Sequence, residues 1–256
     1  MVPGAANCKT TAITWGPVLA IAYIVSAFFL SQILAGLSVS IYPLIQHWNQ
    51  AQANHWIQSS VWGQFVYVFL AESLMVGALY LFLRLRRVSW RAIGWRKPRW
   101  SDLGWGLSFL PLYYLSYLVV VMAVQVFVPH LNTSQAQQIG FEGAHGAADL
   151  IVVFISLVLL PPFVEELAVR GFLYTSLKKS MPKVAAVITT SAIFASAHLQ
   201  AGSGAPLLWI AFIDTFVLSL FLIYLRDKTN GLWANMTLHA SKNLVAFISL
   251  VLAHKL

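Results

Sequence analysis

The sequence has few charged residues and almost no cysteine. Only 9% of its 256 residues are charged, whereas soluble domains average roughly 25%. Since 59% of the residues are hydrophobic, we expect a membrane protein rather than a soluble globular one. The single cysteine, Cys8, excludes an internal disulfide and leaves no cysteine cluster for a structural metal.

Acidic residues are also scarce, with 8 Asp and Glu against 16 Lys and Arg, and the formal net charge is +8. A charge of this sign can indicate nucleic-acid binding. Here, however, the cations form short clusters between apolar runs, as they do in the cytoplasmic loops of membrane proteins. We therefore expect no nucleic-acid partner and interpret the clusters as orientation signals.

The sequence contains no ten-residue alternation of apolar and polar residues, which is typical of a membrane barrel. Instead, seven apolar runs reach or approach the roughly 20 residues that a helix needs to cross a bilayer. They cover residues 13–42, 60–83, 103–128, 149–177, 184–200, 206–225 and 232–253. The predicted fold is all-α, a polytopic bundle of about seven transmembrane helices. Nothing marks a second domain, so we expect one membrane domain over residues 1–256.

Basic residues occur in every second loop. The loops 43–59, 129–148 and 201–205 contain no Lys or Arg, whereas the intervening three loops contain most of them. Because cytoplasmic loops are enriched in Lys and Arg, these three loops and the N-terminus, with Lys9, should be cytoplasmic. Only Lys255 would lie on the other side.

The loop RLRRVSWRAIGWRKPRW, residues 84–100, mixes seven cations with Trp90, Trp95 and Trp100. This mixture is typical of an interfacial segment that lies against anionic lipid headgroups. The alternative is a docking surface for an acidic partner.

Several ionisable residues lie inside the predicted spans. Each costs at least about 2.5 kcal/mol on insertion scales, and such residues therefore indicate functional sites. The set is Glu72, Glu165, Glu166, Arg170, His198, Asp214, His239 and Lys242, with the neutral Asn243 beside it. The alternative is that these groups only hold the bundle together.

The segment FVEELAVRGF, residues 163–172, has two adjacent glutamates at the end of an apolar run. Glu166 and Arg170 are four residues apart and can pair on one helix face, whereas Glu165 is turned about 100° away. Pro161 and Pro162 should kink the helix and free carbonyl groups, so that water can enter. We predict a structural pair and a free Glu165.

Helix rise places four polar side chains from three spans at similar depth. At about 1.5 Å per residue, Glu165, His198 and Asn243 lie roughly 20–22 Å from the cytoplasmic ends of their spans, and His239 about 16 Å. Such a set suits hydrolysis. A shielded carboxylate can activate a water held beside an imidazole, and a His and an Asn one turn apart can stabilise the oxyanion that forms.

A metal site is the alternative chemistry. Two histidines and a glutamate could bind zinc and leave an open position, although no HExxH-type spacing is present. We expect no metal and no cofactor, with zinc as the alternative. Glu72 and Asp214 lie at similar depth, and Lys242 could neutralise either of them.

Three short motifs resemble those of one family. EELAVRGFLY (165–174), FASAH (194–198) and HASKN (239–243) resemble the motifs of the CPBP intramembrane proteases, the CAAX-protease and bacteriocin-processing group also called the Abi family. The resemblance covers residues 149–253. It implies a glutamate protease whose catalytic core follows the N-terminal spans of residues 1–148.

The resemblance also implies residue roles. Glu165 and His198 would activate water, and His239 and Asn243 would form the oxyanion hole. Residues expected to support the site are Glu166, Arg170 and Phe194. Positions that depart from the family pattern are Asp214 and Lys242, together with Ser219 and Ile223, where glycine is frequent.

Eukaryotic members of the family remove the last three residues of prenylated CAAX proteins, and prokaryotic members are linked to bacteriocin maturation and self-immunity. The compact chain is more similar to the second group. We therefore expect a multi-pass endopeptidase of a prokaryotic plasma membrane, surrounded by lipids, that cleaves a membrane-associated or prenylated peptide or protein. A noncatalytic scaffold or bacteriocin-immunity protein is the main alternative, and a transporter or channel is a third. The sequence does not indicate an oligomeric state.

Overall fold

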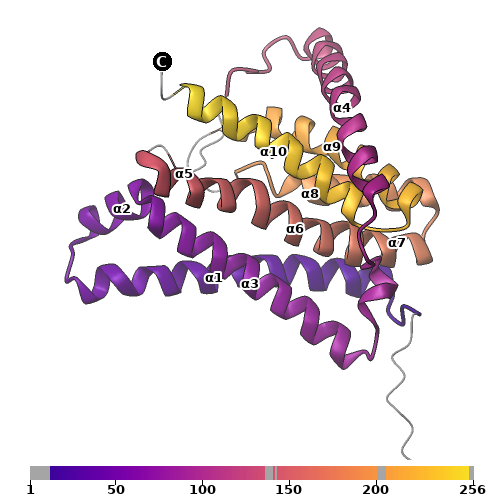
Figure 1. Cartoon of the computed structure of the whole chain (residues 1–256), viewed down its shortest axis with the longest axis horizontal. Coiled ribbons are helices and arrows are strands. Elements are labelled where there is room, and N and C mark those ends of the chain that lie inside the picture. Colours follow the sequence, from indigo (N-terminus) through magenta and orange to yellow (C-terminus); the bar gives the residue numbers. More distant parts are fainter. Residues whose placement is uncertain (1–11, 136–140, 142, 201–205, 254–256) are drawn as a thin grey trace, which may run out of the picture.

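The computed structural model describes residues 12–135, 141, 143–200 and 206–253. The predictions made for Cys8, Lys9, Lys255 and loop 201–205 lie outside these residues. Within the described part, the chain forms helices and loops without a strand, which confirms the all-α prediction. Figure 1 shows the helices packed alongside one another as a bundle, with α4 crossing the others at one end.

Five helical stretches are long and apolar enough to cross a membrane. They are α1 (Pro17–Ile45), α3 (Val61–Leu85), α4 (Trp100–Phe127), the continuous stretch Gly146–Ser180, and α9 (Trp209–Thr229). The remaining two predicted spans correspond to α8 (Lys183–Ser196) and α10 (Trp233–Ala253). The stretch Gly146–Ser180 consists of α5 (Gly146–Phe154), η2 (Ile155–Leu159), α6 (Leu160–Glu165), η3 (Glu166–Tyr174) and α7 (Thr175–Ser180).

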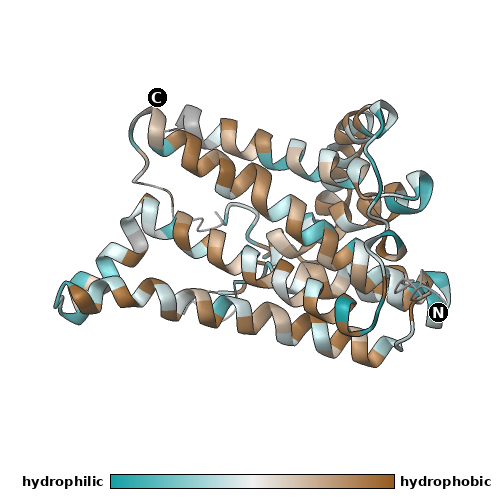
Figure 2. Cartoon of the chain, turned by 60° about the horizontal axis from the view of Figure 1, so that its bottom comes forward, coloured by the Kyte–Doolittle hydropathy of each residue, from teal (hydrophilic) through white to brown (hydrophobic). Residues whose placement is uncertain are grey.

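The long helices expose much of their apolar surface. In α4, only 6% of the most apolar 18-residue window is buried inside the protein. Figure 2 shows hydrophobic residues along the helices, with many of the hydrophilic ones toward the two ends of the bundle. Because exposed apolar area costs roughly 25 cal/mol per Å² in water, this surface requires lipid around it.

Two helix boundaries differ from the prediction. The segment 43–59, expected to be a loop, contains α2 (Gln50–Ser59), because Asn49 and Gln52 form a reciprocal capping box at its start. The span expected over 184–200 ends earlier, since α8 has 14 residues and stops at Ser196. Gln200 has a positive φ of 50°, a backbone conformation that does not continue a right-handed helix.

Two π-helical segments interrupt the stretch that carries the paired glutamates. The segment η2 ends at Leu159, two residues before Pro161, and η3 begins at Glu166. A proline has no N–H and therefore cannot donate to the carbonyl four residues earlier, which for Pro161 is that of Leu157. The irregular backbone thus lies where the two prolines predict it.

The N-terminal helices pack on the helix that carries the glutamates. An aromatic cluster joins α1, α3 and η3: the ring of Phe172 lies 5.7 Å from that of Tyr23 in α1 and 5.1 Å from that of Phe82 in α3. Trp15, just before α1, stacks on the same ring at 5.3 Å. The indole N–H of Trp15 donates to Ser176, at 2.8 Å. These contacts hold the segment 166–176 from one side, while α10 packs against α6 and η2 from the other.

Helices α4 and α10 approach each other closely at Gly106. A Cβ atom at this position would lie 2.5 Å from Cβ of Thr237 and 2.8 Å from the carbonyl oxygen of Ala234. Both distances are shorter than atoms tolerate, and one of the obstacles is backbone. Gly104, on the same helix, has open space around it.

We expect Gly106→Ala to lower the thermal stability of the protein, with an overpacking cost of about 1–3 kcal/mol. The matched control is Gly104→Ala, which should leave the midpoint unchanged or raise it slightly, because alanine favours the helix. Thermal unfolding of the two variants in detergent measures the difference. Equal midpoints would show that α4 and α10 do not pack as described.

Candidate active site

Three parts of the chain bring the candidate side chains together. Glu165 ends α6, Phe194 lies near the end of α8, and His239 lies in α10. Contacts of α8 with η3, and of α10 with α6 and η2, close the bundle around them. Figure 1 shows α6, α8 and α10 as neighbours in the centre of the molecule.

Glu166 and Arg170 form the ion pair that their spacing predicts. Nη1 of Arg170 donates to Oε1 of Glu166 at 2.9 Å, and neither side chain is exposed. The same oxygen lies 3.1 Å from Nδ1 of His239. A buried charge without partners is costly, so the carboxylate joins η3 to α10.

His239 lies between the two glutamates. Its Nδ1 faces Glu166 as described, and its Nε2 lies 3.7 Å from Oε2 of Glu165. Since a carboxylate accepts hydrogen bonds, Nδ1 carries the proton that points to Glu166. In a neutral imidazole, Nε2 then presents a lone pair toward Glu165.

Glu165 is the freer of the two carboxylates. Its side chain is 28% exposed, whereas that of Glu166 is not exposed at all. Its Oε2 atom is buried and has no hydrogen-bond partner among the described residues. The structure therefore contains the free Glu165 that helix geometry predicts, with a carboxylate oxygen able to accept a proton or a hydrogen bond.

Phe194 holds three of the candidate residues in place. The guanidinium carbon of Arg170 lies 4.2 Å from its ring centroid, close enough for a cation–π interaction. The rings of His198 and His239 approach it edge-on, with centroids at 5.0 and 6.0 Å. Phe194 is only 4% exposed, so its ring is a buried packing surface shared by Arg170 and the two imidazoles.

His198 lies in the turn that follows α8 rather than on the helix itself. Its Nδ1 is 3.0 Å from the carbonyl oxygen of Phe194, to which it donates, and this leaves Nε2 as the nitrogen able to contact a ligand. The imidazole within 4 Å of the Glu165 carboxylate is that of His239. The shared action of Glu165 and His198 on one water remains a prediction.

Asn243 uses part of its amide for structure. Its Nδ2 donates to the carbonyl oxygen of Leu157 at 2.9 Å, which is the carbonyl that Pro161 leaves without a helical partner. A carboxamide nitrogen has two hydrogens, so one remains for another acceptor. The predicted freeing of carbonyl groups by the two prolines therefore explains how Asn243 is oriented.

Asp214 and Lys242 form an ion pair beside the site. Nζ of Lys242 lies 3.0 Å from Oδ2 of Asp214, and the hydroxyl of Tyr113 donates to the other carboxylate oxygen. Lys242 thus neutralises Asp214 rather than Glu72, which forms no ion pair within the described part of the chain. Tyr113 was not predicted. The signal that could have identified it is a tyrosine deep in an apolar span, where a hydroxyl needs a partner.

Within the described residues, no group of three or more His, Cys, Asp and Glu side chains could hold a metal ion. Glu165 and His239 are the pair that would supply the first two ligands of such a site. The expectation that the protein uses no metal or cofactor stays a prediction.

Comparison with known families gives a match over residues 147–245 to the family described as Type II CAAX prenyl endopeptidase Rce1-like. Residues 147–245, called the Rce1-like segment below, are therefore similar to this family. This confirms the resemblance to the CAAX-protease group. The Rce1-like segment contains every candidate site residue, from Glu165 to Asn243, whereas α1 to α4 lie outside it. No curated protein and no solved structure matches the chain.

The Rce1-like match and the apolar helices together indicate an integral membrane protein of peptidase type. The partners that this indicates are a lipid environment and a peptide substrate.

Because Glu166 is fully buried, we expect Arg170→Met to destabilise the protein strongly, by about 3–5 kcal/mol, as it leaves an uncompensated charge. The double variant Glu166→Gln/Arg170→Met removes both charges and should recover part of this loss. Thermal unfolding in detergent of the parent, both single variants and the double variant measures the coupling. Additive losses would contradict the pairing.

Proposed function

We propose that this protein is an intramembrane endopeptidase that uses a water activated by Glu165 to hydrolyse a peptide bond. The substrate would be a membrane-associated or prenylated peptide or protein. The observation that carries this proposal is the Oε2 atom of Glu165, buried without a hydrogen-bond partner among the described residues and 3.7 Å from the His239 imidazole, inside the Rce1-like segment. This carboxylate oxygen makes no hydrogen bond that would stabilise the fold of the described residues.

In the proposed reaction, the Glu165 carboxylate takes a proton from water as the oxygen attacks the carbonyl carbon of the scissile bond. Nε2 of His198 is free to hold the same water, since Nδ1 is used by the Phe194 carbonyl. Collapse of the tetrahedral intermediate breaks the C–N bond. The leaving amine then takes the proton from Glu165, so that one water is consumed and the carboxylate is regenerated.

The developing oxyanion requires donors. The second amide hydrogen of Asn243 is one of them, and protonated His239 supplies the other through Nε2. Glu166 supports this role, because its carboxylate accepts from Nδ1 and stabilises an imidazolium at His239. Arg170 and Phe194 hold Glu166 and the two imidazoles in position.

We expect Glu165→Gln to lower peptide cleavage by about 10²–10⁴-fold, because the amide keeps the size of the side chain but cannot act as a base. Cleavage of a prenylated peptide library by purified protein measures this, and mass spectrometry of membrane peptides identifies the substrate. The matched control is Asp149→Asn, which also removes one carboxylate but lies at the start of the same helical stretch. Unchanged cleavage by the Glu165→Gln variant would contradict the proposal.

The metal alternative has its own test. If a carboxylate is the base, cleavage should persist after treatment with 1,10-phenanthroline. Loss of cleavage that added zinc restores would instead assign the water to a metal held by Glu165 and a histidine.

A noncatalytic scaffold or bacteriocin-immunity protein is the second candidate. The observation that favours it is the pairing of the ionisable groups, since Glu166, Arg170 and His239 contact one another, as do Asp214 and Lys242. A scaffold predicts that Glu165→Gln retains biological activity, whereas a peptidase loses it.

A further inference from the structure

A pocket of about 640 Å³ lies at the loop between α3 and α4, and its lining contains none of the candidate active-site residues. It is lined mainly by three tryptophans and three cations, Trp90, Trp95, Trp233, Arg91, Arg96 and Lys97. Its lining contains no acidic residue among those that the structure describes. The pocket is therefore aromatic and positively charged at once.

Hydrogen bonds and a ring contact hold the side chains that form the wall of the pocket. Arg96 binds both carboxylate oxygens of Asp102, at 2.8 and 2.5 Å, and also donates to the carbonyl oxygen of Thr229. The indole N–H of Trp233 donates to the backbone oxygen of Arg96 at 2.6 Å, and its ring lies 5.0 Å from that of Trp95. Arg96 is thus committed to structure and holds the loop against the α9–α10 connection.

The other two cations are left for a ligand. Arg91 and Lys97 are exposed, and neither belongs to an ion pair in the part of the chain that the structure describes. Asp102, beside the pocket, is already bound twice by Arg96, and Asp227, which lines a second pocket together with Arg91, is paired with Lys178 and Lys183. A bound anion would therefore meet two unneutralised charges.

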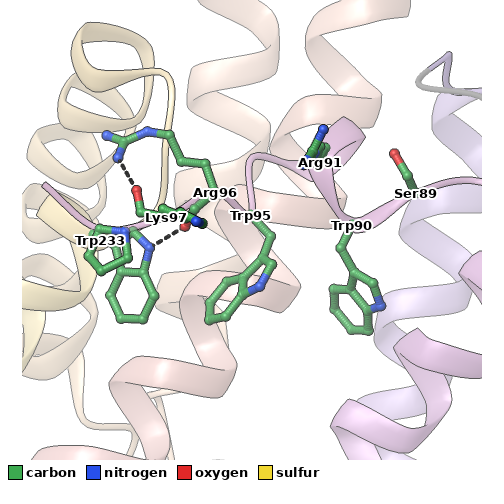
Figure 3. Close-up of a pocket in the computed structure, with 8 residues that line it drawn as sticks. Ser89, Trp90, Arg91, Trp95, Arg96, Lys97 and Trp233 are labelled. Atoms are coloured by element: carbon green, nitrogen blue, oxygen red, sulfur yellow. Dashed lines mark hydrogen bonds between the residues drawn. The ribbon is translucent and has the colours of Figure 1, made fainter.

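The pocket also has two chemically different sides. Figure 3 shows the indole rings of Trp90, Trp95 and Trp233 pointing one way from the loop, and the guanidinium groups of Arg91 and Arg96 pointing the other way. Indoles prefer the boundary between hydrocarbon and water, and cations prefer the headgroup layer beyond it. An amphipathic ligand fits this arrangement better than a free anion does.

The position in the fold places the pocket at the membrane surface. The loop begins after α3, which ends at Leu85, and stops before α4, which begins at Trp100. Both helices are long and apolar enough to span, so the residues between them lie at headgroup level. A lipid reaches this level by lateral diffusion, whereas an acidic protein would use the charges but leave the indoles without a role.

We propose that this pocket binds the headgroup of an anionic phospholipid, with Arg91 and Lys97 on the phosphate and the three indoles along the glycerol and upper acyl region. Trp95 also packs edge-on against Phe163, at 5.7 Å, two residues before Glu165. The bound lipid thus lies next to the helix that carries the paired glutamates. The proposal does not depend on catalysis.

The test is a lipid titration of the full chain in detergent, read by native mass spectrometry, with phosphatidylglycerol as the probe and phosphatidylcholine as the neutral comparison. The parent should bind phosphatidylglycerol more tightly. Arg91→Gln/Lys97→Gln should lose roughly 30-fold in affinity for it, which corresponds to about 1 kcal/mol for each charge. Arg91→Lys/Lys97→Arg keeps both charges and should retain binding.

The matched control is Arg84→Gln/Arg87→Gln, which removes two exposed charges at the end of α3 and the start of the loop, outside the pocket, and should change the affinity only slightly. Equal losses in the two glutamine variants would mean a diffuse surface field and would overturn the proposal. So would equal binding of the two lipids, or full displacement of phosphatidylglycerol by inorganic phosphate or by a soluble acidic peptide. Only variants that elute from gel filtration at the same volume as the parent are compared, so that misfolded protein does not enter the affinity measurement.

Discussion

The arrangement of the site depends on one buried carboxylate. Oε1 of Glu166 is shared by Nη1 of Arg170 and Nδ1 of His239, and the groups around it exclude water. In a low-dielectric interior, an ionised carboxylate persists only where such partners neutralise it. By accepting from Nδ1, Glu166 also determines that Nε2 is the nitrogen of His239 that points toward Glu165. The pair that the spacing marks as structural therefore orients the group beside the candidate base.

The two prolines orient another candidate residue, Asn243. Pro161 cannot donate to the carbonyl of Leu157, and that carbonyl instead accepts from the Asn243 amide. A defect in one helix thus becomes a contact with another. The π-helical segments on either side of α6 show that the backbone adjusts here, which is common at functional sites.

The helices outside the Rce1-like segment contribute to the same region from two directions. The aromatic cluster around Phe172 fixes η3 against α1 and α3. The loop between α3 and α4 packs Trp95 between Phe163, two residues before Glu165, and Trp233, at the start of the helix that carries His239. The loop at the membrane surface is thus in direct packing contact with both of these helices.

Composition and run length determined that the chain is helical and membrane-embedded, because long apolar runs without the alternation of barrel strands can cross lipid only as helices. The spacing of Glu166 and Arg170 determined their pairing, since residues four apart share a helix face. Both conclusions are local, and local geometry does not depend on how helices are placed. The end of α8, by contrast, lies four residues before the predicted one, because the turn that holds His198 leaves no local signal as strong as proline.

Only the tertiary structure decided which groups from different helices meet. From the sequence, Lys242 could neutralise Asp214 or Glu72, and His198 or His239 could lie next to Glu165. The choice depends on the rotation and axial shift of each helix, which close packing determines, as between Gly106 and Thr237. The sequence determined which helices carry the polar groups and at roughly what depth, whereas the packing of one helix against another decided their partners.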